Sequence, residues 1–110
     1  MKTLYVAGPM TGIPEFNYPA FDAAEHALAA RGYLVLNPTH AEKHNPTPGT
    51  PQAWGWYMRH CIRMVLAADG MALLPGWENS RGATLEHAIA TALDLDVRTL
   101  DRWMEAEAIR

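Results

Sequence analysis

The sequence of 110 residues has one cysteine, no long apolar run and no excess of positive charge. A lone cysteine, Cys61, permits no internal disulfide and no thiolate-rich metal site. Nine Lys and Arg against twelve Asp and Glu give a formal net charge of −3, which argues against a nucleic acid polymer or an anionic membrane as the main partner. No apolar run approaches the roughly 20 residues of a membrane span, and Met1 is not followed by a signal-like segment. We therefore expect one cytoplasmic domain over residues 1–110.

Short segments rich in β-forming residues alternate with segments of helical periodicity. The predicted strands cover residues 3–7, 33–36, 71–74 and 96–100. The predicted helices begin near Pro19, at Trp54 and after Gly82, with a further one over 101–110. This alternation predicts an α/β fold with a mostly parallel sheet and right-handed crossovers.

Apolar spacing indicates which helix faces are expected to be buried. The expected stripes are Phe21, Ala24 and Leu28 in the first helix, Met58, Ile62, Val65 and Leu66 in the second, and Leu85, Ala88, Ile89 and Ala92 in the third. Four prolines between residues 37 and 52 predict a long surface loop with little structure of its own. Trp103 and Met104 lack an obvious partner, which favours a homo-oligomer.

Two polar, glycine-containing loops, 8–14 and 75–82, each follow a predicted strand. In parallel sheets, ligands bind beyond the carboxyl ends of the strands, so both loops are expected at one site. The first contains Gly8, Pro9, Met10, Thr11 and Gly12. Its amides and Thr11 hydroxyl could hold a phosphate, although a tight strand-to-helix turn explains the glycines equally well.

The second loop leads into a helix through Ser80, Arg81 and Gly82, with Glu86 in the early part of that helix. Helix amides beside Ser80 suit an anion such as phosphate, and Gly82 allows close approach of a ligand. Glu86 lies at the edge of the expected apolar stripe and could project into the cleft as a nucleophile or base. The alternative is a first-turn acid that favours the helix dipole.

Other candidates have plainer alternatives. Tyr5 could orient a carboxylate or be a core aromatic, and Asp69 fits a turn before the third strand. Cys61 is expected to be a buried inert thiol. His40 and His44 lack a third ligand, so no metal or cofactor is expected. Core packing or an oligomer interface accounts for most of a group of four aromatic residues, Trp54, Trp56, Tyr57 and Trp77. Trp77 follows a strand end and could also flank a planar ligand.

The motifs Leu4–Gly12, Leu73–Trp77 and Ser80-x-Gly82-x-x-x-Glu86-x-Ala88 together resemble small proteins of the nucleoside 2-deoxyribosyltransferase-like superfamily. The resemblance covers about residues 3–95. It implies a flavodoxin-like or Rossmann-like three-layer sandwich with four to five strands, and a homo-oligomer. It also implies cleavage of the N-glycosidic bond of a nucleoside or nucleotide, with Glu86 attacking the anomeric carbon, Tyr5 holding Glu86, and Gly8 and its neighbours lining the sugar site.

Two positions refine what the resemblance implies. Ser80 stands where enzymes acting on 5′-monophosphates have Ser and those acting on free nucleosides have Asp, and Arg81 is expected to add positive charge near the phosphate. Cys61 stands eight residues before Asp69, where catalytic members carry an Asp that helps protonate the leaving base. A thiol is a weak donor, and lost general-acid help costs about 10²–10⁴-fold in rate.

Three hypotheses follow. The first is an N-glycosidase or deoxyribosyltransferase-like enzyme acting on a (deoxy)nucleoside 5′-monophosphate. The second is a catalytically weak module that binds or senses a nucleotide, favoured by Cys61. The third is an interaction protein that has only inherited the site. Binding without turnover would select the second, and neither binding nor turnover the third.

Overall fold

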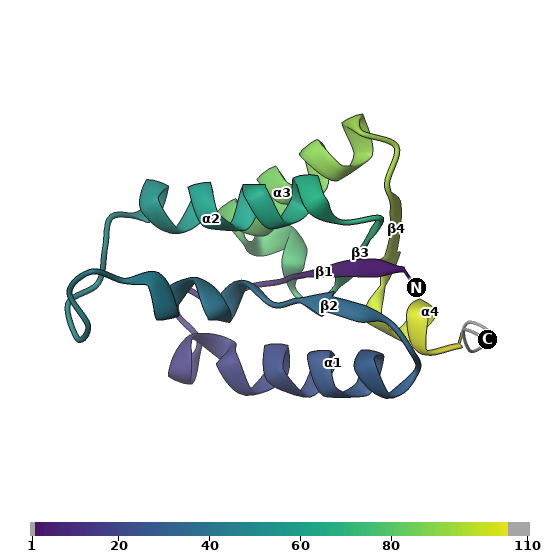
Figure 1. Ribbon diagram of the computed structural model, residues 1–110, viewed down its shortest axis with the longest axis horizontal. Coiled ribbons are helices and arrows are strands. Elements are labelled where there is room, and N and C mark those ends of the chain that lie inside the picture. Colours follow the sequence, from purple (N-terminus) through teal and green to yellow (C-terminus); the bar gives the residue numbers. More distant parts are fainter. Residues whose placement is uncertain (1, 106–110) are drawn as a thin grey trace.

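A four-stranded, fully parallel sheet forms the centre of the computed structural model, which describes residues 2–105 (Figure 1). The strands are β1 (Thr3–Ala7), β2 (Leu34–Leu36), β3 (Gly70–Leu73) and β4 (Asp96–Thr99), in the order β2-β1-β3-β4. The predicted parallel α/β sheet is therefore confirmed, with strand ends shifted by a residue at β2, β3 and β4.

Helices cover both faces of the sheet (Figure 1). The helix α1 (Tyr18–Ala30) lies on one face with the short α4 (Leu100–Glu105), and α2 (Trp54–Ala67) lies on the other with α3 (Arg81–Ala92). Each face has its own apolar cluster, one around Phe21 and Leu28 and one around Val65 and Met71. This arrangement confirms the three-layer sandwich. The part of the predicted final helix beyond residue 105 lies outside the described residues.

Trp103 is fully covered within its own chain, which corrects the expectation that it lacks a partner. Its side chain is 1% exposed, and its indole N–H donates to the Met71 carbonyl at 2.8 Å. The Tyr33 ring packs edge-on against it, and the Arg98 guanidinium lies 4.4 Å from its ring centroid. Met104 packs against the same cluster. Neither residue therefore supports an oligomer.

Two of the three expected apolar stripes are wrong in part. Phe21, Ala24 and Leu28 are buried as expected. In α2 the buried residues are Met58, Cys61 and Val65, whereas Leu66 is 61% exposed; in α3 they are Ala83, Glu86 and Ala90, whereas Leu85 is 40% exposed. Small alanines let α3 approach the sheet, and its inward face includes a carboxylate, so the largest apolar residues did not mark the buried side.

The segment over 37–52 is also more ordered than expected, because residues Pro38–His44 form the 3-10 helix η2. The buried Asn37 begins it: its Oδ1 accepts a hydrogen bond from the Thr39 N–H at 3.0 Å. Its amide also donates to Asp22 and Glu25 of α1, at 3.0 and 2.9 Å. These bonds fasten η2 to the fold. Two further 3-10 turns are η1 (Pro14–Asn17) and η3 (Trp77–Asn79).

The strand order creates a switch point between β1 and β3. From β1 the chain crosses through α1 to β2 on one side, and then through α2 to β3 on the other side. Loops leaving β1 and β3 therefore diverge at their carboxyl ends, where a crevice forms. None of the described helices is long and apolar enough to cross a membrane.

Candidate active site

A cavity of about 980 Å³ opens at the carboxyl end of β1, between the loop after β1, the helix α2 and the start of α3. This is the edge of the sheet at which the two polar loops were expected to meet. Ten of the predicted site residues line the cavity: Tyr5, Gly8, Pro9, Met10, Thr11, Cys61, Ser80, Arg81, Gly82 and Glu86.

The pair formed by Tyr5 and Glu86 is buried in the wall of this cavity. The Tyr5 hydroxyl donates a hydrogen bond to Glu86 Oε2 at 2.7 Å, and the glutamate is only 5% exposed. Burial raises the pKa of Glu86 to about 7, while the hydrogen bond from Tyr5 lowers it. Burial, followed by the charge of Glu86, raises the pKa of Tyr5, which keeps its proton. One carboxylate oxygen is held by Tyr5, and the other has no hydrogen-bond partner among residues 2–105, an arrangement suited to nucleophilic attack.

Cys61 lies next to this pair, on the buried face of α2. Burial, followed by the charge of Glu86, raises the pKa of its thiol to about 12, and a hydrogen bond with Tyr5 opposes this rise. The thiol is therefore protonated and unreactive at neutral pH, as expected for a buried cysteine. It presents one weak donor to the cavity.

The amino end of α3 faces the cavity through Ser80, Arg81 and Gly82. Ser80 caps the helix, since its Oγ accepts a hydrogen bond from the Ala83 N–H at 3.1 Å. The first amides of the helix, those of Arg81 and Gly82, have no acceptor within the helix. Gly82 also lets α3 lie close to α2, because a Cβ there would come within 3.2 Å of Met58 Sδ. This helix start is an anion-binding geometry.

The Arg81 side chain lies over the ring of Trp54 at the start of α2, and both residues line the cavity. Its guanidinium carbon lies 3.9 Å from the Trp54 ring centroid. Among residues 2–105 no carboxylate lies within ion-pair distance of this guanidinium. The indole ring thus orients the Arg81 guanidinium, which stays charged and keeps its N–H groups available as donors.

The loop after β1 forms another wall of the cavity. Gly8 is required by packing, since a Cβ there would lie 2.8 Å from Leu74 Cβ. The amide of Asn17 donates to the Pro9 carbonyl at 3.0 Å and closes the loop. Glu15, Phe16 and Asn17 all have positive φ, between 51° and 61°, and the first two line the cavity. Sequence reasoning did not single out these residues, because their left-handed backbone shows no glycine pattern.

The cavity is also lined by residues of η2, α1 and α2 to which the sequence does not assign a site. Glu42 on η2 accepts a hydrogen bond from the Tyr57 hydroxyl at 2.9 Å, and Tyr18 at the start of α1 lies near both. Burial, followed by the charge of Glu42, raises the pKa of Tyr18. The sequence predicts core packing or an oligomer interface for most of the aromatic group, whereas the structure places Trp54 and Tyr57 at the cavity.

Three predicted residues lie apart from the cavity lining. Asp69 is at the amino edge of the sheet, where its Oδ2 accepts a hydrogen bond from the Thr3 N–H at 2.8 Å, so its role is to join two strand ends. Gly12 takes the turn beyond Thr11 with φ of 83° and does not line the cavity. Trp77 stacks on His87, with ring centroids 4.4 Å apart.

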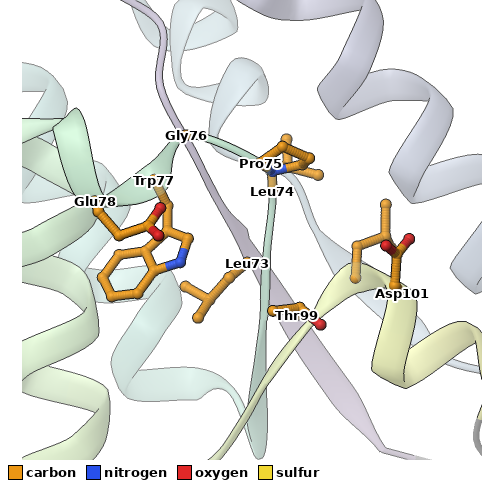
Figure 2. Close-up of a pocket in the computed structure, with 9 residues that line it drawn as sticks. Leu73, Leu74, Pro75, Gly76, Trp77, Glu78, Thr99 and Asp101 are labelled. Atoms are coloured by element: carbon orange, nitrogen blue, oxygen red, sulfur yellow. The ribbon is translucent and has the colours of Figure 1, made fainter.

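Trp77 lines a separate, smaller hollow of about 200 Å³ (Figure 2). This hollow lies between the end of β3 and the junction of β4 with α4, and Thr99 and Asp101 form its other side. The histidines noted as a possible ligand pair point to different neighbours: His40 contacts Glu25 at 3.3 Å, and His44 stacks on His60. In the described part of the chain no group of three or more His, Cys, Asp or Glu side chains is placed to hold a metal.

Residues 2–99 match the model of a family described as a domain of unknown function, DUF4406. Among solved structures, a 2-desoxiribosyltransferase from Leishmania mexicana is similar, with a TM-score of 0.66 and 20% sequence identity. The match covers 90% of this chain and 63% of that chain, so this chain spans less than two thirds of its length. No curated protein matches the sequence. The likeness confirms a nucleoside 2-deoxyribosyltransferase-like fold.

Proposed function

The chain belongs to the DUF4406 family, and we propose that it cleaves the N-glycosidic bond of a (deoxy)nucleoside 5′-monophosphate, by hydrolysis or by deoxyribosyl transfer. The buried pair of Tyr5 and Glu86, in the wall of a cavity large enough for a nucleotide, carries this proposal. The likeness to the fold of a 2-deoxyribosyltransferase supports the same class of reaction.

In the first step Glu86 is the nucleophile. Tyr5 holds Oε2, which leaves Oε1 to attack the anomeric carbon of the sugar. The bond from C1′ to the base nitrogen breaks as the bond to Oε1 forms, and the base leaves with the bonding electron pair and takes up a proton. The product is a glycosyl ester of Glu86.

In the second step an incoming group attacks C1′ and releases the Glu86 carboxylate. In hydrolysis this group is water, which loses a proton and gives the free sugar phosphate. In transfer it is a ring N–H nitrogen of a second base, which loses its proton and gives a new nucleotide. Both steps invert C1′, so the overall configuration is retained.

The departing base needs a proton, and the chain offers little help. The Cys61 thiol, whose pKa is raised to about 12 by burial and by the charge of Glu86, is a poor proton donor. Water therefore supplies the proton, and bases that leave easily are expected to react fastest.

The amino end of α3 is the proposed phosphate site. Ser80 caps this helix without carrying charge, Arg81 and Gly82 line the cavity, and the Arg81 guanidinium lies over the Trp54 ring. A dianionic phosphate here would be stabilised by the helix dipole, by hydrogen bonds from the first helix amides and by the positive charge of Arg81. An unphosphorylated nucleoside would leave these donors without a partner.

The direct test is release of free base from a panel of ribo- and deoxyribonucleoside 5′-monophosphates and from the matching nucleosides, followed by chromatography. We expect release from monophosphates, lowered by at least about 10³-fold in Glu86→Gln, the scale seen when a covalent nucleophile is removed. Release from nucleosides alone would refute the phosphate site. Release that persists in Glu86→Gln would refute the nucleophile.

A second candidate function is a nucleotide-binding module with little or no turnover. The observation that favours it is the buried, protonated Cys61 at the position where the resemblance implies an acid. Thermal stabilisation by one monophosphate without base release would select this function, and measurable turnover would exclude it.

We also propose that the protein forms a homo-oligomer. Its support is the set of exposed leucines on the outer helical layer, Leu66 on α2 and Leu85 on α3 with Leu93 just beyond it. Light scattering of the wild type and of Leu85→Glu tests this. A monomeric wild type would contradict the proposal, and dissociation in the variant would locate the interface.

A further inference from the structure

Besides Glu86 and Glu15, the cavity is lined by the carboxylate of Glu42 on η2, an element separate from the proposed phosphate site on α3. Two neutral donors hold it: the Tyr57 hydroxyl donates to Oε2 at 2.9 Å, and the Asn45 amide donates to Oε1 at 2.7 Å. Within the described residues no Lys, Arg or His lies within ion-pair distance of it. The carboxylate is therefore oriented, and each of its oxygens keeps a lone pair for another donor.

The position of Tyr57 relates Glu42 to the reaction centre. Tyr57 lies one helical turn before Cys61 on α2, and both side chains line the cavity. A sugar whose C1′ is next to Glu86 would direct its base along α2, past Cys61 and toward Tyr57 and Glu42. This step rests on the proposed function, because it assumes that the sugar is at Glu86 and the phosphate at α3.

The chemistry of a carboxylate favours one base at this point. An ionised carboxylate accepts hydrogen bonds through two oxygens and donates none. Guanine presents two adjacent donors, the N1–H and the 2-amino group, which match both oxygens. Adenine and cytosine place a ring nitrogen acceptor beside their amino group, and uracil and thymine place a carbonyl on each side of their single imino N–H. Each of these bases would bring an acceptor against a carboxylate oxygen.

We propose that Glu42, oriented by Tyr57 and Asn45, binds the Watson–Crick edge of a guanine base and makes the site selective for guanine nucleotides. Tyr57 is a positioning residue in this arrangement, since it acts through Glu42. Among residues 2–105 the other buried polar side chains have roles elsewhere: Asn37 and Thr39 fasten η2 to α1, and Glu86 belongs to the proposed reaction centre.

The test compares deoxyguanosine, deoxyinosine and deoxyadenosine 5′-monophosphates as substrates, and as ligands of Glu86→Gln by calorimetry. Hypoxanthine, the base of deoxyinosine, differs from guanine only in lacking the 2-amino group, so this comparison isolates one hydrogen bond. We expect the guanine nucleotide to be preferred by about tenfold or more over the hypoxanthine nucleotide. We expect the guanine nucleotide to be preferred over the adenine nucleotide by about 10²-fold or more, because a carboxylate that accepts two hydrogen bonds rejects a base without two adjacent donors.

Glu42→Gln should reduce both ratios to within about threefold of unity, because an amide offers one acceptor and one donor. Tyr57→Phe should reduce them by a smaller factor, since one anchor of the carboxylate remains. Glu78→Gln, on the exposed turn outside the cavity, is the matched control and should keep both ratios. Circular dichroism confirms folding, and Tyr57→Phe alone tests the proposal if Glu42→Gln does not fold.

The outcomes separate this inference from the proposed function. Monophosphates cleaved with no guanine preference, or with a preference that survives Glu42→Gln, would overturn the inference and leave the proposed function standing. Guanine-selective binding that depends on Glu42 but occurs without turnover would support the inference and overturn the enzymatic function. Failure to bind any nucleotide would overturn both.

Discussion

The hydroxyl of Tyr5 and the carboxylate of Glu86 meet at 2.7 Å across the junction of the first strand and the third long helix. The two residues are 81 positions apart in sequence, and both are buried. The helix α3 thus turns a charged side chain toward the sheet, where a strand residue holds one of its oxygens. This contact fixes a buried carboxylate at the switch point of the sheet.

Removing the Tyr5 hydroxyl should move the pH dependence of base release. The hydrogen bond from Tyr5 lowers the pKa of Glu86, so Tyr5→Phe should raise that pKa above about 7. A hydrogen bond to a charged group contributes about 1.5–3 kcal/mol, which corresponds to roughly one to two pKa units. The acidic limb of kcat/KM should therefore shift to higher pH, with a loss of about tenfold or more at pH 6. Tyr33→Phe, on the opposite face of the sheet, is the control and should not shift the profile.

Glu86→Gln should make the protein more stable at alkaline pH. Burial, the largest cause, raises the pKa of Glu86 from 4.5 in the unfolded chain to about 7 in the fold. The folded protein then binds more protons than the unfolded one between these values, so its stability falls as pH rises through that window. The full effect is about 3 kcal/mol. Denaturant unfolding should give a higher free energy of unfolding for Glu86→Gln than for the wild type at pH 8, and no gain near pH 4. An equal difference at both pH values would contradict a buried glutamate with a raised pKa.

Trp54→Ala should weaken binding of phosphorylated ligands alone. The indole supports the Arg81 guanidinium at 3.9 Å, a contact worth about 0.5–2 kcal/mol. We expect KM for a monophosphate to rise by about 3–30-fold, with kcat for the bound substrate kept and the KM of the matching nucleoside unchanged. Trp54→Phe should recover part of the loss, since it keeps an aromatic face. A loss shared equally by nucleoside and nucleotide would show that Trp54 does not act through the phosphate site.

Two glycines offer a matched test of packing. At Gly70 a Cβ would lie 2.8 Å from the Asp96 carbonyl oxygen and 2.9 Å from Leu4 Cδ2, so Gly70→Ala should destabilise the fold by about 1–3 kcal/mol. At Gly55, in the first turn of α2, nothing lies within 4 Å, and Gly55→Ala should stabilise it by about 0.5–1 kcal/mol. Thermal unfolding of both variants measures the contrast. Equal changes in melting temperature for the two variants would mean that the sheet adjusts to accommodate a Cβ at Gly70.

The layers of the fold and the edge at which the cavity opens follow from the order of the amino acids alone. β-forming runs ended by glycine, proline or asparagine define β1, β2 and β3, because these breakers stop a strand whatever surrounds it. Parallel topology then sends the loops after β1 and β3 to one edge, so Gly8 and Ser80 line one cavity. These are local or topological rules, and they need no knowledge of side-chain contacts.

Which helix faces are buried, and which residues of η2 reach the cavity, depends on packing between distant parts of the chain. The buried side of α3 carries Ala83, Glu86 and Ala90 rather than the larger Leu85, because close packing on the sheet selects small residues and the carboxylate gains a partner in Tyr5. Glu42 reaches the cavity only because Asn37 turns residues 38–44 into a helix fastened to α1. Contacts between residues so far apart in sequence leave no periodic pattern, since each depends on where the other elements come to rest.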